Sequence, residues 1–137
     1  MAVRFLLDTN ILSHLVREPQ GRVANRITGV GEDAVCTSII VAAELRFGAA
    51  KSSSKHIKDR VHRILSAMNV MPLDPPADQH YGDIRQVLEK RGTPVGPNDL
   101  LIAAHARAMG LIVVTANVKE YARVPGLVTE NWLAGND

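Results

Sequence analysis

Residues 3–17, VRFLLDTNILSHLVR, decide the fold of this chain. They begin with a short, mostly apolar run, which is typical of a strand buried in a sheet. The polar residues that follow end the strand, and either Thr9 or Asn10 can cap a helix over Ile11–Arg17. The stretch therefore predicts a strand, a tight turn and a helix, with Asp8 at the carboxyl end of the strand.

The rest of the chain repeats this alternation of short apolar runs and longer helical segments. A second helix is expected to end near Gly29. Further strands and helices are expected, in chain order, over residues 34–37, 39–50, 55–69, 70–73, 77–91, 97–109, 111–114 and 127–129. Apolar strands that alternate with helices form parallel sheets covered on both faces, so the pattern predicts an α/β protein with a central parallel sheet. Ligands of such a sheet bind at the carboxyl ends of its strands.

The composition is that of a globular protein. The chain has 137 residues, about the length of one domain, and no internal repeat or linker, so we expect one domain over residues 1–137. Hydrophobic residues make up 46% and charged residues 22%, which excludes the disordered and collagen-like classes. The formal net charge is only +2, so any contact with nucleic acid must depend on where the charges lie.

The sequence favours a protein of the cytoplasm. No apolar run reaches the roughly 18 to 20 residues that a membrane span needs. The apolar stretch near the start is too short for the core of a signal peptide. The single cysteine, Cys36, excludes an intrachain disulfide framework and fits a reducing compartment.

Several well-known catalytic motifs are absent. The chain has no phosphate-binding GxxxxGKS or GxxxxGKT, no GxGxxG after the first strand and no GxSxG. Its five histidines lack the HExxH spacing or any comparable ligand pattern. These absences count against P-loop hydrolysis, dinucleotide chemistry, the usual serine hydrolases and a zinc site.

Three acidic residues lie in the least polar parts of the sequence. Asp8 closes the first strand, Glu44 lies inside a helix that is apolar nearly all round, and Asp99 opens the helix over 97–109. Neither helix offers its acid a cation one turn away. Burial of unpaired carboxylates is unfavourable, and gathering three of them raises their pKa values by mutual repulsion. A divalent cation such as Mg²⁺, which prefers oxygen ligands, compensates that charge.

Each of these acids also has a purely structural explanation. Asp8 can cap the first helix, and Asp99 can interact with the positive end of its helix dipole. Glu44 can pair with a distant Arg. Glu44 is the hardest to explain in this way, because neither a cap nor a dipole accounts for an acid in the middle of a helix.

Basic residues gather in the middle of the chain. They are Arg46, Lys51, Lys55, Lys58, Arg60 and Arg63. On a helical hairpin beside the acids they would guide a polyanion's backbone toward a metal. An ordinary solvated face explains them equally well.

Four motifs, in this order, span almost the whole chain. They are LLDTNILS with Asp8, AAELRFGA with Glu44, PNDLLIAAHA with Asp99 and VVTANVKEYARVPGL with Asn117. The set resembles the PIN-domain family, and more specifically the VapC-type toxins of bacterial toxin–antitoxin pairs. The resemblance implies a three-layer α/β/α sandwich with a central parallel sheet of about five strands.

The resemblance also implies a metal-dependent endoribonuclease that forms dimers and is inhibited by a partner antitoxin. Asp8, Glu44 and Asp99 would then bind Mg²⁺ or Mn²⁺. Thr9 and Thr115 would order the acidic ends of their strands. The sequence differs from the family pattern at position 117, where many relatives carry a fourth Asp.

The fourth acidic position of the family pattern is therefore occupied differently in this chain. We expect Asn117, which follows the strand over 111–114, to lie beside Asp8 and to act on the metal indirectly, because its amide adds no charge. Its oxygen can accept from a metal-bound water, or its nitrogen can donate to a carboxylate. Glu120 is expected to reach the metal through water and to restore a fourth negative charge. The alternative for Glu120 is a solvent-exposed turn residue.

The combined interpretation is an endoribonuclease whose metal activates a water for attack on RNA phosphodiesters. A small antitoxin is expected to pack on the hairpin around Phe47–Leu65 and to send an Arg toward the carboxylates. Two alternatives stay open. One is a noncatalytic module that binds RNA or protein, and the other, less favoured, is a phosphatase that uses Asp8 as its nucleophile.

Overall fold

A five-stranded, all-parallel sheet in the order β3-β2-β1-β4-β5 runs through the computed structural model, which describes residues 2–134. The strands are β1 (Phe5–Leu7), β2 (Val35–Ser38), β3 (Asn69–Met71), β4 (Ile112–Val114) and β5 (Thr129–Glu130). The predicted central parallel sheet is confirmed, with β3 and β5 displaced by one or two residues from their expected positions.

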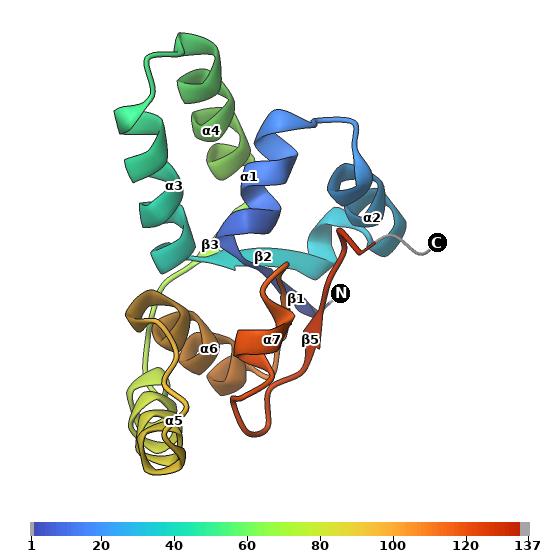
Figure 1. Cartoon of the computed structure of the whole chain (residues 1–137). Helices are drawn as coiled ribbons and strands as arrows, with labels where there is room; N and C mark the ends of the chain where they lie inside the picture. The colour runs from blue at the N-terminus through green and yellow to red at the C-terminus, as the bar shows by residue number, and fades with distance from the viewer. Residues whose placement is uncertain (1, 135–137) are drawn as a thin grey trace.

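Helices cover both faces of the sheet. They are α1 (Thr9–Arg17), α2 (Arg22–Val30), α3 (Ile39–Lys51), α4 (Lys55–Ala67), α5 (Ala77–Arg91), α6 (Pro97–Met109) and the short α7 (Val118–Tyr121). In Figure 1, α1–α4 lie above the sheet and α5–α7 lie below it. The arrangement is the predicted three-layer α/β/α sandwich. No helix within residues 2–134 is long and apolar enough to span a membrane.

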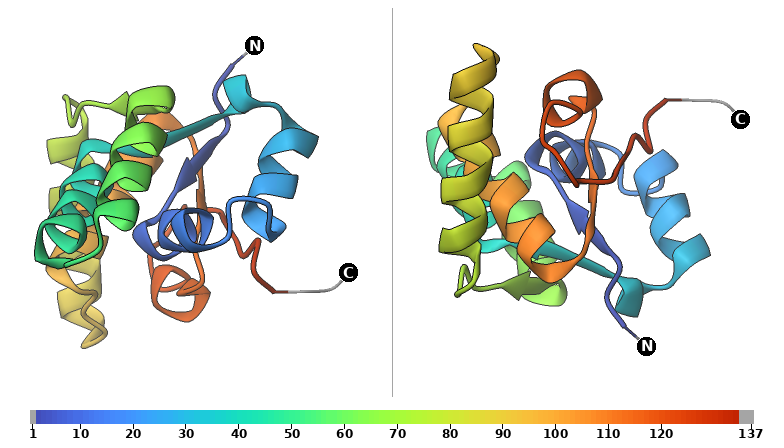
Figure 2. Two further views of the ribbon diagram at one scale, coloured as in Figure 1. Left: turned by 90° about the horizontal axis from the view of Figure 1, so that it is seen from above. Right: turned by 90° about the horizontal axis from the view of Figure 1, so that it is seen from below.

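β1 is the centre of the molecule. It pairs with β2 on one side and β4 on the other, and Figure 2 shows it in dark blue running between the helices. Leu6 and Leu7 are fully buried, as are Ile11 and Leu12 on α1. Because the middle strand carries Asp8 at its carboxyl end, this acid is held at the centre of the sheet edge.

The first helix begins at Thr9, two residues earlier than the sequence predicts. Its N-cap is Asp8, whose carboxylate accepts the N–H of Thr9 at 2.8 Å, so the prediction of a Thr9 or Asn10 cap is wrong. The physical reason is that Asp8 keeps extended backbone angles directly after β1, and the chain turns into the helix at the next residue. Asp8 therefore does cap the first helix, as its purely structural explanation predicts, but only through Oδ1.

Helix α3 is less enclosed than its apolar sequence predicts. It packs against α1, α4 and α6. A helix that is apolar nearly all round is expected to be covered by protein on both sides. Ile39 and Phe47, however, are 46% and 64% exposed, so this expectation is wrong for the part of α3 that carries them. Figure 1 shows the reason, since α3 lies at the outer side of the molecule with no helix beyond it.

Candidate active site

Asp8 and Thr115 lie together because their strands are neighbours in register. Leu7 on β1 lies opposite Val114 on β4. The Asp8 N–H donates to the Val114 carbonyl oxygen at 2.9 Å, which extends the pairing to the first residue beyond the strand. The parallel sheet thus places both polar side chains at its carboxyl edge.

Asp8, Glu44 and Asp99 line one open cavity of about 370 Å³. β1 leads to the first acid, α3 carries the second and α6 carries the third. The other residues of the wall are Thr9, Asn10, Ser13 and Arg17. The structure therefore brings together three acids from distant parts of the sequence. They line the cavity without converging on one position. Within residues 2–134, no three or more His, Cys, Asp or Glu side chains are arranged so that they could hold a metal ion without further ligands.

Asp8 is the most deeply buried of the three acids, at 2% exposure. Besides capping α1 with Oδ1, it accepts the hydroxyl of Thr115 on Oδ2 at 2.8 Å. Burial raises the pKa of Asp8, and the charge of Glu44 raises it further, while the hydrogen bonds from Thr9 and Thr115 lower it. Its ionised form is thus held in place by donors but lacks a neutralising charge.

Glu44 is half-buried and is held by two neutral donors. The hydroxyl of Thr9 donates to Oε1, and the side-chain amide of Asn98 donates to Oε2 at 2.9 Å. No Lys or Arg of residues 2–134 forms an ion pair with it. The alternative of a buried pair with a distant Arg is therefore wrong in the described structure.

Asp99 lies in the first turn of α6 and is surrounded by negative charge. Burial, followed by the charges of Asp8 and Glu120, raises the pKa of Asp99 to about 6. The O–H of Tyr121 donates to Asp99 Oδ1 at 3.2 Å and acts in the opposite direction. The helix dipole explains the position of Asp99 but leaves this repulsion uncompensated.

Asn117 and Glu120 form a second polar group beside Asp99. The side-chain amide of Asn117 donates to Glu120 Oε1 at 2.9 Å, and the Gly96 N–H donates to Oε2 at 2.8 Å. Partial burial raises the pKa of Glu120, but these hydrogen bonds outweigh it and leave the pKa below its usual value. Neither residue lines the cavity of the three acids, and Asn117 points its amide nitrogen at Glu120.

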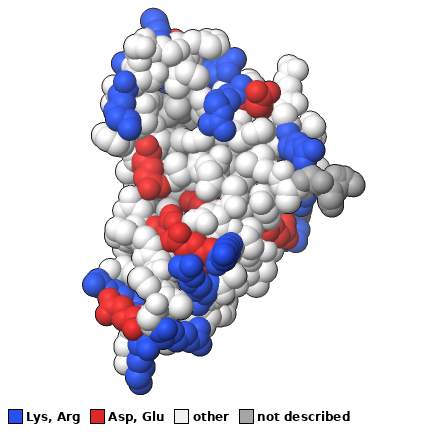
Figure 3. Space-filling view, viewed as in Figure 1, with Lys and Arg blue, Asp and Glu red and all other residues white. Residues whose placement is uncertain are grey.

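Acidic and basic side chains occupy different parts of the face that carries the cavity. Figure 3 shows acidic side chains near the middle of this face, with Lys and Arg side chains above and below them. Arg17 is the one basic residue in the cavity wall as described, and it is exposed. A polyanion that reaches the acids would therefore meet basic residues on both sides and Arg17 at the wall.

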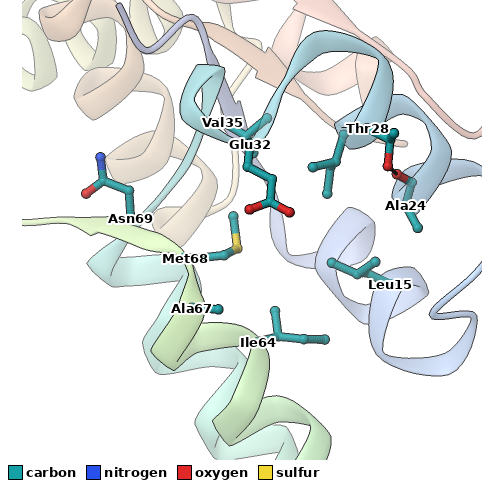
Figure 4. A pocket seen from close by; sticks show the side chains of 10 residues that line it. Leu15, Ala24, Thr28, Glu32, Val35, Ile64, Ala67, Met68 and Asn69 are labelled. Atoms are coloured by element: carbon teal, nitrogen blue, oxygen red, sulfur yellow. Dashed lines mark hydrogen bonds between the residues drawn. The ribbon is translucent and has the colours of Figure 1, made fainter. Parts of the chain in front are cut away.

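A second cavity, of about 290 Å³, lies between α1, α2 and α4 (Figure 4). Leu15, Ile27 and Ile64 form much of its apolar wall. Val35 and Asn69, which also line it, are the first residues of β2 and β3. The cavity is therefore at the amino edge of the sheet, away from the acids.

Comparison with known proteins identifies the family to which this fold and site belong. The family model described as PIN domain matches residues 5–127. The chain belongs to the PIN-domain family. The resemblance inferred from its four motifs is thereby confirmed.

Relatives of this PIN domain cover nearly its full length. The tRNA(fMet)-specific endonuclease VapC of Shigella flexneri is 39% identical over 95% of this chain and 98% of its own. VapBC of Salmonella typhimurium, solved bound to DNA, is 37% identical with a TM-score of 0.89, over 95% of this chain and 98% of that one. VapBC2 of Rickettsia felis, solved with a promoter DNA fragment, is 33% identical with a TM-score of 0.88, over 95% and 99%.

The donors of the cavity fit a divalent cation. All three acids offer carboxylate oxygens, which Mg²⁺ and Mn²⁺ prefer. Burial raises the pKa values of Asp8 and Asp99, and none of the three acids pairs with a Lys or Arg of the described chain. Mg²⁺ usually keeps several waters, so its carboxylates need not converge on one point.

Sequence reasoning missed two contacts of this PIN domain. Asn98, which holds Glu44, directly precedes Asp99, but an exposed Asn gives no signal of such a long-range bond. Tyr121 lies in the fourth motif, and only its position beside Glu120 connects it with the site. The contacts of Thr9 with Glu44 and of Thr115 with Asp8 agree with the ordering that the resemblance implies.

Proposed function

We propose that this PIN domain is an endoribonuclease toxin of the VapC type, and that Asp8, Glu44 and Asp99 hold the divalent cation on which its activity depends. One observation carries the proposal of the site. Three acids from separate elements line one cavity, and none of them has a basic partner within the described chain. The VapC ribonucleases among its relatives support the activity.

The residues of the chain prepare the carboxylates for the cation. A Mg²⁺ or Mn²⁺ held by Asp8, Glu44 and Asp99 would supply an activated water and a positive charge beside the leaving oxygen. Thr115 and the Thr9 N–H hold Asp8, while the Thr9 hydroxyl and Asn98 hold Glu44. Such donors hold the carboxylate oxygens in fixed positions at the cavity, ready for a metal. No protein nucleophile is needed.

Asn117 and Glu120 do not bind the cation directly in this proposal. Glu120 lies close enough to Asp99 for their charges to repel, so it adds negative charge beside the three acids. We infer that it contacts the cation through a water, as the sequence predicts. Asn117 acts through Glu120, whose carboxylate it orients by its amide N–H.

RNA would reach the site across basic residues. Arg17 stands at the cavity wall and is free of ion pairs within residues 2–134. Of the basic residues on the hairpin, Arg60 donates to the carbonyl of Val16, Lys55 pairs with Asp59, and Lys51 lies over the ring of Phe47. Arg46, Lys58 and Arg63 form no ion pair within residues 2–134 and are available to contact phosphates. Initiator tRNA is the first substrate to test, because relatives are named for its cleavage.

An antitoxin would cover the site in the cytoplasm, where RNA would otherwise be cleaved. Structures of related chains are VapBC toxin–antitoxin complexes, which supports a partner of this kind and a hetero-oligomer. We place its docking on the hairpin of α3 and α4, where Phe47 is exposed and Ile57 half-buried. An Arg from the antitoxin would enter the cavity and bind the carboxylates. A homodimer of the toxin stays a further expectation.

Cleavage of purified tRNA tests the activity and its metal requirement. We expect cleavage with Mg²⁺ or Mn²⁺, none with EDTA, and loss of cleavage in Asp8→Ala, Glu44→Ala and Asp99→Ala, with the far-UV circular dichroism unchanged. Equal cleavage in EDTA, or activity in all three variants, would contradict the proposed site. RNA binding without cleavage would support the noncatalytic module, and a phosphoaspartate trapped at Asp8 would support the phosphatase.

A further inference from the structure

Tyr121 is a buried polar side chain that the mechanism above does not use. It is the last residue of α7 and has 0% exposure. Its O–H donates to Asp99 Oδ1 at 3.2 Å, and its phenol also interacts with the carboxylate of Asp8. Tyr121 does not line the cavity of the three acids. It therefore approaches the two aspartates from the protein side.

The position of Tyr121 is fixed by the elements around it. The N–H of Asn117 donates to the hydroxyl of Thr115 at 2.9 Å, which ties the start of α7 to the end of β4. The Tyr121 N–H donates to the Asn117 carbonyl at 3.3 Å. Thr115 in turn donates to Asp8. One continuous chain of contacts thus connects the phenol with the sheet edge that carries the site.

Asp99 has fewer hydrogen-bond donors than the other two acids of the cavity, and Tyr121 is one of these donors. Asp8 has the Thr9 N–H and the Thr115 hydroxyl, and Glu44 has Thr9 and Asn98. Asp99 faces the charges of Asp8 and Glu120. The phenol of Tyr121 donates its O–H to Asp99 from outside the cavity of the three acids. It is therefore a donor that does not occupy the place of the cation.

We propose that Tyr121 is a positioning residue of the cation site, whose O–H binds one oxygen of Asp99 and leaves the other oxygen for the cation. This role rests on the proposed function, because it presupposes that Asp99 holds a divalent cation. The hydrogen bond fixes the orientation of the carboxylate. Loss of such a contact behind a metal ligand typically costs about 10- to 100-fold in metal affinity.

Tyr121→Phe tests the role by removing only the oxygen atom. Mn²⁺ binding to the purified full chain is measured by electron paramagnetic resonance and calorimetry, without RNA. We expect the Mn²⁺ dissociation constant to rise by about 10- to 100-fold. The Mn²⁺ concentration for half-maximal cleavage should rise in parallel, while cleavage at saturating Mn²⁺ stays close to wild type. Tyr81→Phe is the matched control, since the hydroxyl of Tyr81 accepts from Arg85 on α5 and Tyr81 does not line the cavity of Asp8, Glu44 and Asp99.

A measurement on the intact phenol keeps the role testable if Tyr121→Phe folds poorly. The chain has two tyrosines, so Tyr81→Phe leaves Tyr121 as the only one. With ¹³Cζ-labelled tyrosine, Mg²⁺ should shift the single phenol resonance with the midpoint of metal binding. Where Tyr121→Phe folds, it should have little additional effect on Mn²⁺ affinity in an Asp99→Ala background, because the acceptor of its hydrogen bond is gone.

The outcomes separate this role from the function on which it rests. A folded Tyr121→Phe with wild-type Mn²⁺ affinity would overturn the role of Tyr121, as would a phenol resonance that ignores Mg²⁺. A wild-type chain that binds no Mn²⁺ would overturn the proposed cation site and the role of Tyr121 together. A rise in the dissociation constant for Tyr121→Phe and not for Tyr81→Phe would support the role.

Discussion

Asp99 makes the metal-free protein less stable as the pH rises. Its pKa is about 6 in the folded chain, against an ordinary value of 3.8, so the folded state binds the proton more tightly than the unfolded state. The raised pKa means that stability is greatest below the unfolded value and falls as the pH rises through about 6. Asp99→Asn removes the charge, so we expect the metal-free variant to be more stable than wild type at pH 8. The gain should be on the order of 1 kcal/mol, because solvent screens this half-buried group.

Urea unfolding in EDTA between pH 4 and pH 8 measures this effect. The free energies of unfolding of wild type and Asp99→Asn should converge near pH 4, separate between about pH 4 and pH 6, and differ by a constant amount above that range. Asp33→Asn, at an exposed position before β2, is the control and should follow wild type. A less stable Asp99→Asn at pH 8 would show that the acids are not repelling one another.

Glu120 and Asn117 provide a second test at the scale of single residues. Glu120→Gln removes a charge that lies beside Asp99, and Asn117→Ala removes the amide that orients it. We expect both variants to need about 10- to 100-fold more Mg²⁺ for half-maximal cleavage. Because Asn117 acts through Glu120, the double variant should resemble Glu120→Gln alone. Titration curves that overlay wild type would exclude both residues from the site.

The sequence predicts acids better than it predicts their neutral partners. Asp8, Glu44 and Asp99 are recognisable because charge in an apolar segment needs an explanation. Tyr121 and Asn98 give no comparable signal in the sequence, since a tyrosine in a core and an asparagine at a helix start are common. Their contacts depend on tertiary placement, which residue spacing does not contain.

At the scale of elements, the hairpin of α3 and α4 differs most from its prediction. The apolar sequence of α3 indicates enclosure, but periodicity cannot tell that the helix lies at the outer side of the molecule. The exposed Phe47 that results is a ready contact for the antitoxin. Phe47→Ser should therefore weaken antitoxin binding by at least tenfold while leaving tRNA cleavage unchanged.

Calorimetry with the cognate antitoxin tests this surface. Met109→Ser is a matched control, because Met109 is also an exposed apolar residue but lies at the end of α6. Only the Phe47 variant should lose affinity. Unchanged binding by Phe47→Ser, with loss by Met109→Ser, would move the antitoxin to the other side of the sheet.

At the scale of the molecule, the sequence predicts the layers because each strand is a short apolar run between helices. Parallel pairing then brings the ends of β1 and β4 together without further information. The shifts of one or two residues occur at β3 and β5 because these strands lie at the two edges of the sheet, where fewer contacts fix their ends. The site inherits its geometry from the central strands, whose positions are the most strongly determined.

The same geometry couples cation binding to the stability of the whole fold. A ligand that binds only the folded chain stabilises it by about 2.7 kcal/mol at 100 times its dissociation constant. For a domain of this size that corresponds to a rise in Tm of roughly 10 °C. We expect saturating Mg²⁺ or Mn²⁺ to raise the Tm of wild type at pH 7.5 by about this amount. Asp8→Asn and Glu44→Gln should lose most of the rise while Asp33→Asn keeps it. An equal rise in all four proteins would place the stabilising cation outside the cavity.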